Sequence, residues 1–441
     1  MSSIMEGSGD AEWPEDEQRE GSSSSGSEVN NMEEEQQFDI NLAAEHSYMG
    51  TGLVCVPGRS VLEEGWRGRV PVLAHHGAVF PGETVPLLRA DARDAALLAA
   101  VIRQDKLFGL LCPNETGTMV SGYGVLCEVF ETSAGWLEEG AAQGGALVVK
   151  ARATHRFRFV RMPRRDVPLQ KYSRIRAEWV RVLPELAPPP PLRAARLASL
   201  DPHRRPPAPA PAPAPDPRAL EAQLRRLDAA LTPWPPFVYD IFDYQRMRHT
   251  IRDYCRTIGL ESEVPDDPTS LSFWAASNLA LTTRDRFRLF VADNALLRLR
   301  MEVRIISRHR VLCCAECAGE ISRREHIFPM SSEGVHSNYT NPGGYMHDVV
   351  TVSHVSNAAL SGRASAEYSW FPGYAWTVAL CAACAAHVGW RFDAMRRGLR
   401  PQRFYGLCRN TVQPRALGPA PAPAPGPIPR DPGDDSDADA P

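Results

Sequence analysis

Apolar and polar residues alternate in short runs between residues 69 and 186, a period that is typical of strands. Residues 70–73 and 79–87 predict a strand, a loop and a second strand, and residues 107–111 predict another strand. Residues 92–102 follow helical spacing instead. Phe157 and Phe159 alternate with Arg156 and Arg158, which predicts a strand that buries one face. We therefore expect a β-rich domain over 69–186, preceded by an extension over 38–68.

Between residues 218 and 305 the apolar residues recur at the spacing of amphipathic helices. The first stripe follows a plausible helix start at Asp216-Pro217. The three stripes are Leu220, Leu224, Leu227 and Leu231; Ile241, Tyr244, Met247, Ile251, Tyr254 and Ile258; and Phe287, Phe290, Val291, Asn294, Leu297 and Met301. This part of the chain predicts a helical bundle.

Strand-like alternation returns on both sides of a Cys-x-x-Cys turn at Cys381 and Cys384. Trp376, Val378 and Leu380 share one face before the turn, and Val388, Trp390 and Phe392 share one face after it. Two strands joined by this turn would bring Trp376 and Trp390 to a common surface, which Trp370 approaches from the preceding turn. The tryptophans could simply be core residues. Alternatively, their flat apolar walls would suit a small ligand with planar polar edges.

A second Cys-x-x-Cys turn lies upstream at Cys314 and Cys317. Two such turns supply four thiolates for a closed tetrahedral zinc site with no open position for catalysis. A redox dithiol is the alternative for a single Cys-x-x-Cys, but two pairs without a secretory signal favour structural zinc. We expect one Zn²⁺ held by Cys314, Cys317, Cys381 and Cys384 in a domain over 306–416. The neighbouring Cys313 and His387 are then not needed as ligands.

Three segments have the composition of disordered chain. Residues 1–37 are acidic and rich in serine and glycine, residues 187–217 form a linker rich in proline and alanine, and residues 417–441 repeat the Ala-Pro pattern. The fold class predicted from the whole pattern is α+β multidomain with disordered tails.

Several motifs resemble the thalidomide-binding (CULT) domain of the cereblon family. They include Asn341-Pro-Gly-Gly-Tyr345, Ser369-Trp-Phe-Pro-Gly-Tyr-Ala-Trp376 and Val388-Gly-Trp-Arg-Phe392. The resemblance implies a zinc-bound β-tent whose three-tryptophan cage binds cyclic imides. Its ligand-binding residues would be Asn341, Tyr368, Trp370, Trp376, Trp390 and Phe392. The family usually has histidine at the positions of Tyr368 and Gly343, and its contact at the first of these is made largely by backbone.

The segment from Pro71 to Leu87 resembles the N-terminal domain of Lon proteases, which the cereblon family also carries. Leu231 to Tyr239 resembles the segment with which that family binds the propeller-shaped DNA-damage-binding adaptor of cullin-RING ligases. The resemblance therefore implies a non-catalytic substrate receptor of a cullin-four type E3 ubiquitin ligase. It would bind thalidomide-type glutarimides and proteins with C-terminal cyclic imides, and direct them to ubiquitination and proteasomal degradation. The alternative is an aromatic-cage reader of methylated lysine or arginine, with Glu367 beside the cation.

Other functions fit the sequence poorly. A Lon-type peptidase needs a Gly-Lys-Ser/Thr phosphate loop and a Ser-Lys pair, but no lysine follows a glycine and none follows Lys171. The arginines are scattered and the net charge is −4, so we expect no nucleic-acid partner. No apolar run reaches the length of a membrane span, and the N-terminus has no apolar signal core. We expect a cytoplasmic and nuclear protein.

Overall fold

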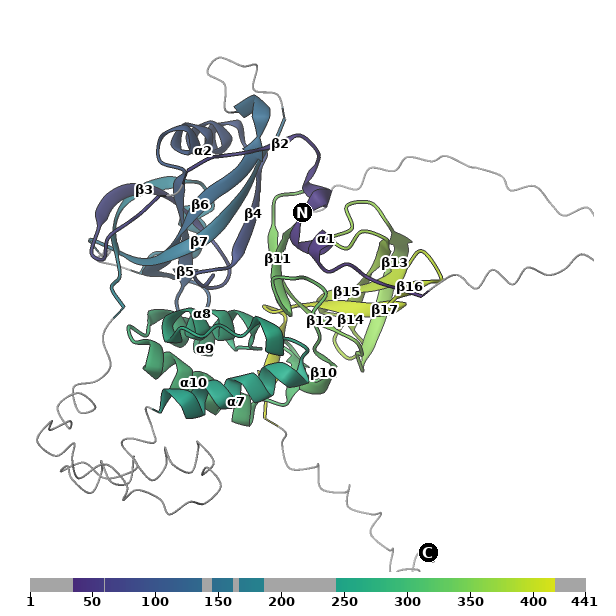
Figure 1. The fold of residues 1–441 in the computed structure, drawn as a ribbon. Coiled ribbons are helices and arrows are strands. Elements are labelled where there is room, and N and C mark those ends of the chain that lie inside the picture. Colours follow the sequence, from purple (N-terminus) through teal and green to yellow (C-terminus); the bar gives the residue numbers. More distant parts are fainter. Residues whose placement is uncertain (1–34, 59, 137–144, 162–165, 186–242, 417–441) are drawn as a thin grey trace, which may run out of the picture.

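The computed structural model describes residues 35–58, 60–136, 145–161, 166–185 and 243–416. A β domain, a group of helices and a second β domain meet in one body (Figure 1). Several predicted segments lie outside the described residues: the first helical stripe, the adaptor-binding segment 231–239, the linker 187–217 and the tail 417–441. Of the predicted N-terminal tail, the structure describes only residues 35–37.

The elements of the first β domain are β2 (Leu53–Cys55), β3 (Arg67–Ala74), β4 (Thr84–Arg89), α2 (Ala92–Gln104), β5 (Leu107–Pro113), β6 (Val120–Ser133), η2 (Ala134–Trp136), β7 (Leu147–Phe159), η3 (Leu169–Tyr172) and β8 (Arg176–Val182). Strands β3, β4, β5 and β7 and helix α2 contain the residues predicted to form strands and a helix, whereas β2, β6 and β8 were not predicted individually. The sheet order is β2-β6-β5-β3-β8-β7-β4, and β6 also pairs with β7, so the sheet closes on itself. Phe157 and Phe159 are buried inside it, as their alternation predicts.

The helical part consists, among the described residues, of α7 (Tyr244–Thr257), η5 (Glu261–Glu263), α8 (Pro268–Asn278), α9 (Thr283–Val291) and α10 (Ala295–Arg308). Helix α7 buries Met247, Ile251 and Tyr254 from the predicted stripe. The prediction that the third stripe forms a single helix is wrong, because its residues are divided between two helices, α9 and α10. Asn294 caps α10 by accepting a hydrogen bond from the Leu297 N–H at 3.1 Å, a role that asparagine favours over a helix interior. Among these helices none combines the length and the apolar character that crossing a membrane requires.

The second β domain holds two sheets. Its elements are β9 (Val311–Cys314), β10 (Glu320–Arg323), η6 (Arg324–His326), β11 (His336–Thr340), β12 (Met346–Val352), β13 (Ala358–Ser365), β14 (Tyr374–Cys381), β15 (His387–Ala394), β16 (Leu399–Arg400), β17 (Arg403–Cys408) and β18 (Val412–Arg415). Six strands pair in the order β11-β12-β17-β15-β14-β13, and a smaller sheet has the order β10-β9-β18. Gly389 allows β15 and β17 to approach closely, since a Cβ there would lie 2.0 Å from the Gly406 carbonyl oxygen.

The N-terminal extension is structured from residue 35, two residues before the predicted tail ends. It forms β1 (Gln36–Gln37), α1 (Asn41–Ala44) and η1 (Ser47–Met49), and β1 pairs with β16 of the second β domain. Composition predicted disorder as far as residue 37, but Phe38 is buried and contacts Tyr374 with ring centroids 5.4 Å apart. The burial of this one aromatic side chain explains why the preceding residues are held in place.

The three parts are joined by buried polar contacts. Arg286 of α9 forms ion pairs with Glu83 of the first β domain at 3.2 Å and with Asp348 of β12 at 3.0 Å. Arg156 alternates with buried phenylalanines and was therefore expected on the solvent side of its strand, but it is only 4% exposed. Its guanidinium donates to the Phe290 carbonyl at 2.6 Å and pairs with Glu185 at 3.0 Å. These contacts satisfy the charges that the domain junctions bury.

Candidate functional site: a four-cysteine centre and an aromatic cage

Both Cys-x-x-Cys turns have the same local structure. Cys314 ends β9 and Cys381 ends β14, and each carbonyl accepts a hydrogen bond from the N–H four residues later. That later residue is Ala318 in one turn and Ala385 in the other, with φ of +62° and +58°. The left-handed residue turns the chain back, so that each pair of thiols points to the same side.

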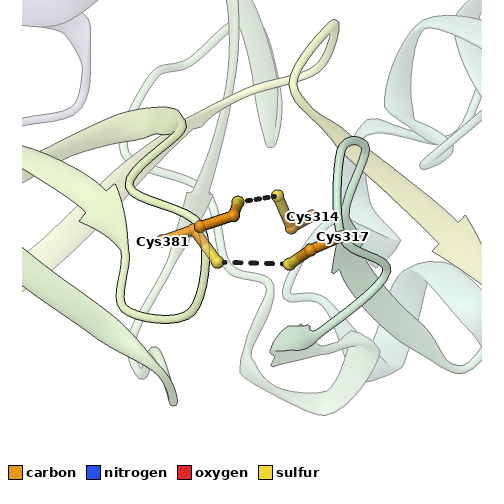
Figure 2. A group of neighbouring side chains, drawn as sticks. Cys314, Cys317 and Cys381 are labelled. Atoms are coloured by element: carbon orange, nitrogen blue, oxygen red, sulfur yellow. Dashed lines mark hydrogen bonds between the residues drawn. The ribbon is translucent and has the colours of Figure 1, made fainter.

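The four thiols form one cluster, three of which Figure 2 labels. The Cys314 and Cys384 sulfurs lie 3.7 Å apart, and those of Cys317 and Cys381 lie 3.5 Å apart. All four sulfurs lie within 4.8 Å of one another. A tetrahedron with zinc–sulfur bonds of about 2.3 Å has sulfur–sulfur edges of about 3.8 Å, so the cluster fits one zinc ion. Cys313 and His387 lie outside the cluster, as predicted.

The cysteine centre holds one end of the aromatic site, because β14 ends at Cys381 and pairs with β15, which begins after the same turn at His387. Their register places Trp376 opposite Phe392 and Val378 opposite Trp390. Residues directly opposite each other on one face of a sheet are in side-chain contact. The predicted common surface of Trp376 and Trp390 therefore exists, and both indoles are half-buried.

Trp370 forms the base of this surface and is far more buried than the two strand tryptophans, at 6% exposure. Its ring stacks on Tyr339 of β11 at a centroid distance of 5.1 Å and an interplanar angle of 11°. It also meets Trp390 edge to face at 4.7 Å. Phe392 is 1% exposed beneath these rings. Trp370 and Phe392 therefore serve the core and the site together.

The turn before Trp370 closes one side of the surface. The Trp376 indole N–H donates to the Glu367 carbonyl oxygen at 2.8 Å, which fixes the turn against β14. Tyr368 follows with φ of +52°, an uncommon backbone conformation for a residue other than glycine. The Tyr368 side chain is 53% exposed. The Glu367 carbonyl of this turn is thus held beside the cage by a hydrogen bond, whereas the Tyr368 ring is largely exposed.

Asn341 approaches the cage from the opposite side, on the hairpin between β11 and β12. Its side-chain oxygen accepts a hydrogen bond from the Tyr345 N–H at 2.9 Å, and its amide nitrogen lies 3.5 Å from His347 Nε2. His347 contacts Trp390 at a ring distance of 5.0 Å. Burial, together with smaller contributions from His387 and His76, lowers the pKa of His347 to about 4, so the ring is neutral at pH 7.

These residues enclose one cavity of about 360 Å³, a volume within the usual range for small-molecule sites. All six side chains that the resemblance assigned to ligand binding line it, together with Pro342, Glu367 and Val378. Pro342 and Val378 were not predicted as site residues, although Val378 shares a strand face with Trp376. His347 behind the cage was not predicted either, and its position two residues after Tyr345 was the available signal.

Comparison with protein families divides the chain between α10 and β9, where the helices end and the second β domain begins. Residues 69–308 match the family described as the ATP-dependent protease La (LON) substrate-binding domain. Residues 310–421 match the family described as Yippee zinc-binding/DNA-binding/Mis18, centromere assembly. The zinc-binding family model covers all four cysteines of the cluster.

Similarity to whole proteins extends across both parts. The chain is 34% identical over 391 residues to protein cereblon of Danio rerio, covering 86% of this chain and 88% of that one. It is 32% identical over 394 residues to protein cereblon of Xenopus tropicalis, covering 87% and 86% of the two chains. The corresponding protein of Gallus gallus is 30% identical over 390 residues. With this coverage, a Lon N-terminal-like domain and a four-cysteine β domain with an aromatic cage, the chain belongs to the cereblon family.

Proposed function

We propose that this protein is the substrate receptor of a cullin-four type E3 ubiquitin ligase and captures targets through C-terminal cyclic imides. The observation that carries the proposal is the cage itself. Trp376 and Trp390 present half-buried faces across a cavity of about 360 Å³ above the buried Trp370. A cyclic imide is a small planar ring with an N–H between two carbonyls. It would place its apolar edge against the indoles and its polar edge towards the Glu367–Tyr368 turn.

In this proposal the protein performs no bond-forming step. The four cysteines would hold zinc, which fixes the two turns and hence the junction where β14 ends and β15 begins. The cage binds and orients the imide, the neutral His347 supports Asn341 and Trp390, and other subunits transfer ubiquitin. The same cage would accept glutarimide drugs. We place the complex in the cytoplasm and nucleus.

The direct experiment is a competition between two ligand classes on the full chain. Glutarimide should quench indole fluorescence saturably, whereas a trimethyl-lysine peptide should not. Glu367 lines the cavity and is the feature that would favour a cation reader. If the trimethyl-lysine peptide binds saturably and glutarimide does not bind, the protein is a cation reader and not an imide receptor.

The adaptor contact requires a separate test. Trp234, Phe237 and Tyr239 belong to the segment that resembles the family's adaptor-binding region. Replacing Trp234 and Phe237 by alanine should abolish co-purification with the DNA-damage-binding adaptor and leave imide binding intact. A longer deletion reaching Tyr254 would be uninformative, since Met247 and Ile251 of α7 belong to the core. Unchanged co-purification of the double variant would exclude this segment as the docking surface.

A further inference from the structure

Four arginines lie on the outer face of the barrel, where β3, β8 and β7 are neighbours: Arg67, Arg69, Arg158 and Arg181. The strand register places Arg181 of β8 opposite both Arg67 of β3 and Arg158 of β7. These three residues thus form one row across three neighbouring strands. Arg69 lies in the next row, two residues along β3 from Arg67. None of the four arginines forms an ion pair with any residue that the structure describes.

The second row carries the apolar part of the same face. Trp179 lies opposite Arg69, and its backbone carbonyl accepts a hydrogen bond from the Val160 N–H at 2.9 Å. Trp179 is 59% exposed and Val160 is 41% exposed. The side chains on the opposite face of the same strands, such as Val70 and Val180, are buried in the barrel core. The exposed tryptophan is therefore not required by the packing of the barrel.

A row of like charges is unfavourable for the fold. Side chains directly opposite on neighbouring strands have Cβ atoms about 5 Å apart, and like charges at that distance destabilise the sheet. The protein as a whole carries a net charge of −4, so the face is a local reversal of its charge. An anionic partner would remove the repulsion between Arg67, Arg181 and Arg158 and would cover Trp179.

The spacing of the two rows defines that partner. Positions two residues apart on a strand are separated by about 7 Å, which is also the distance between alternate side chains of an extended peptide. We propose that this face binds an extended acidic segment of a partner protein, with a carboxylate on the arginine row and an apolar side chain two residues away on Trp179. A nucleic acid fits less well, because three arginines across about 10 Å do not form a track along a phosphate backbone.

The surface is separate from the imide cage. Strand β3 lies on the side of the first β domain that is remote from β13 to β17 (Figure 1). Substitutions on this face should therefore leave glutarimide binding unchanged, which provides an internal check that a variant is folded.

The test uses the full chain and a fluorescent peptide rich in glutamate, with one phenylalanine two positions from a glutamate. Arg181→Gln should weaken peptide binding by about tenfold. The same substitution should raise the melting temperature by about 1–2 °C, because it removes the central charge of the row. A purely structural arginine would not give this opposite pair of effects. Arg363→Gln, at an exposed arginine of β13, is the matched control and should change neither quantity.

Trp179→Ala should weaken the phenylalanine peptide several-fold but leave a peptide with alanine at that position unaffected. Equal affinity of Arg181→Gln and the unmodified chain for the peptide would overturn the proposal. Tighter binding of oligothymidylate than of the peptide would replace it by a nucleic-acid surface. Peptide binding that appears only after removal of residues 1–34 would overturn it in favour of the chain's own acidic tail.

Discussion

Replacing Trp376 by alanine tests whether this residue is a wall of the ligand site or a residue of the core. A fully buried tryptophan costs about 3–5 kcal/mol of unfolding free energy when it is replaced by alanine. Trp376 is half-buried, so about half of this loss is expected, and its hydrogen bond to the exposed Glu367 contributes about 0.5–1 kcal/mol. We therefore expect Trp376→Ala to cost about 2–3.5 kcal/mol, less than the about 4 kcal/mol in the middle of the range for a core tryptophan.

Imide affinity should fall more in Trp376→Ala than in a core-tryptophan variant, which is the reverse of the order expected for stability. Losing the indole wall removes about 50 Å² of apolar contact with the ligand, which corresponds to about 1.3 kcal/mol or a tenfold loss of affinity. Trp136 provides the matched core residue, since it is 5% exposed and belongs to the first β domain. Trp136→Ala should destabilise the protein by about 4 kcal/mol while the folded fraction binds glutarimide normally.

The two quantities are measured on the same samples, by thermal melting and by glutarimide titration. Trp179→Ala, at the 59% exposed position, should change neither of them and controls for the loss of an indole. If Trp376→Ala melts as early as Trp136→Ala and still binds glutarimide with unchanged affinity, Trp376 is a core residue and the ligand site lies elsewhere.

Three further predictions concern the metal, acid stability and the turn beside the cage. Cys384→Ser should remove zinc and unfold the C-terminal β domain, because structural zinc contributes on the order of 10 kcal/mol, whereas Cys55→Ser at an exposed free cysteine should change neither; zinc analysis and melting decide this. Burial lowers the pKa of His75 to about 4, so the unfolded chain takes up a proton first and stability falls as the pH drops from about 6.5 to about 4. The loss is about 3 kcal/mol, and His75→Asn should flatten this part of the stability–pH curve; an unchanged slope would exclude His75 as its cause. Tyr368→Gly should be neutral or stabilising by about 1 kcal/mol because it relieves φ of +52°, and imide affinity should stay within a few-fold; a loss above about tenfold would show that the tyrosine ring contacts the ligand.

The sequence predicted the parts of the site that depend on local periodicity. Alternation along β14 and β15 was enough to place Trp376 and Trp390 on one face, because a short turn fixes the register of two paired strands. The zinc ligands followed from spacing in the same way. The helix break was not predictable from apolar spacing alone, since Asn294 continues the stripe in sequence but caps α10 in the structure.

Contacts between the domains left little trace in the sequence. Arg156 occupies a polar position in an alternating strand, and only the arrival of Phe290 and Glu185 from distant segments buries it. Phe38 directly follows the segment that looks like tail by composition, and its partner Tyr374 is far along the chain. Such contacts depend on domain packing, which periodicity does not encode.

Domain packing also determines how the cage is completed. Asn341 reaches the cavity from the hairpin between β11 and β12, and that hairpin rests on the first β domain. The Asn338 amide donates to the Thr84 carbonyl at 3.1 Å, and a Cβ on Gly344 would lie 2.7 Å from the Leu88 carbonyl. His76 of the first β domain stacks on Tyr345 at 5.1 Å. One side of the aromatic cage is therefore held by the zinc-bound turns and the other by the Lon N-terminal-like domain. An isolated fragment over 306–416 would keep the first support and lose the second, so imide affinities describe the complete site only when they are measured on the full chain.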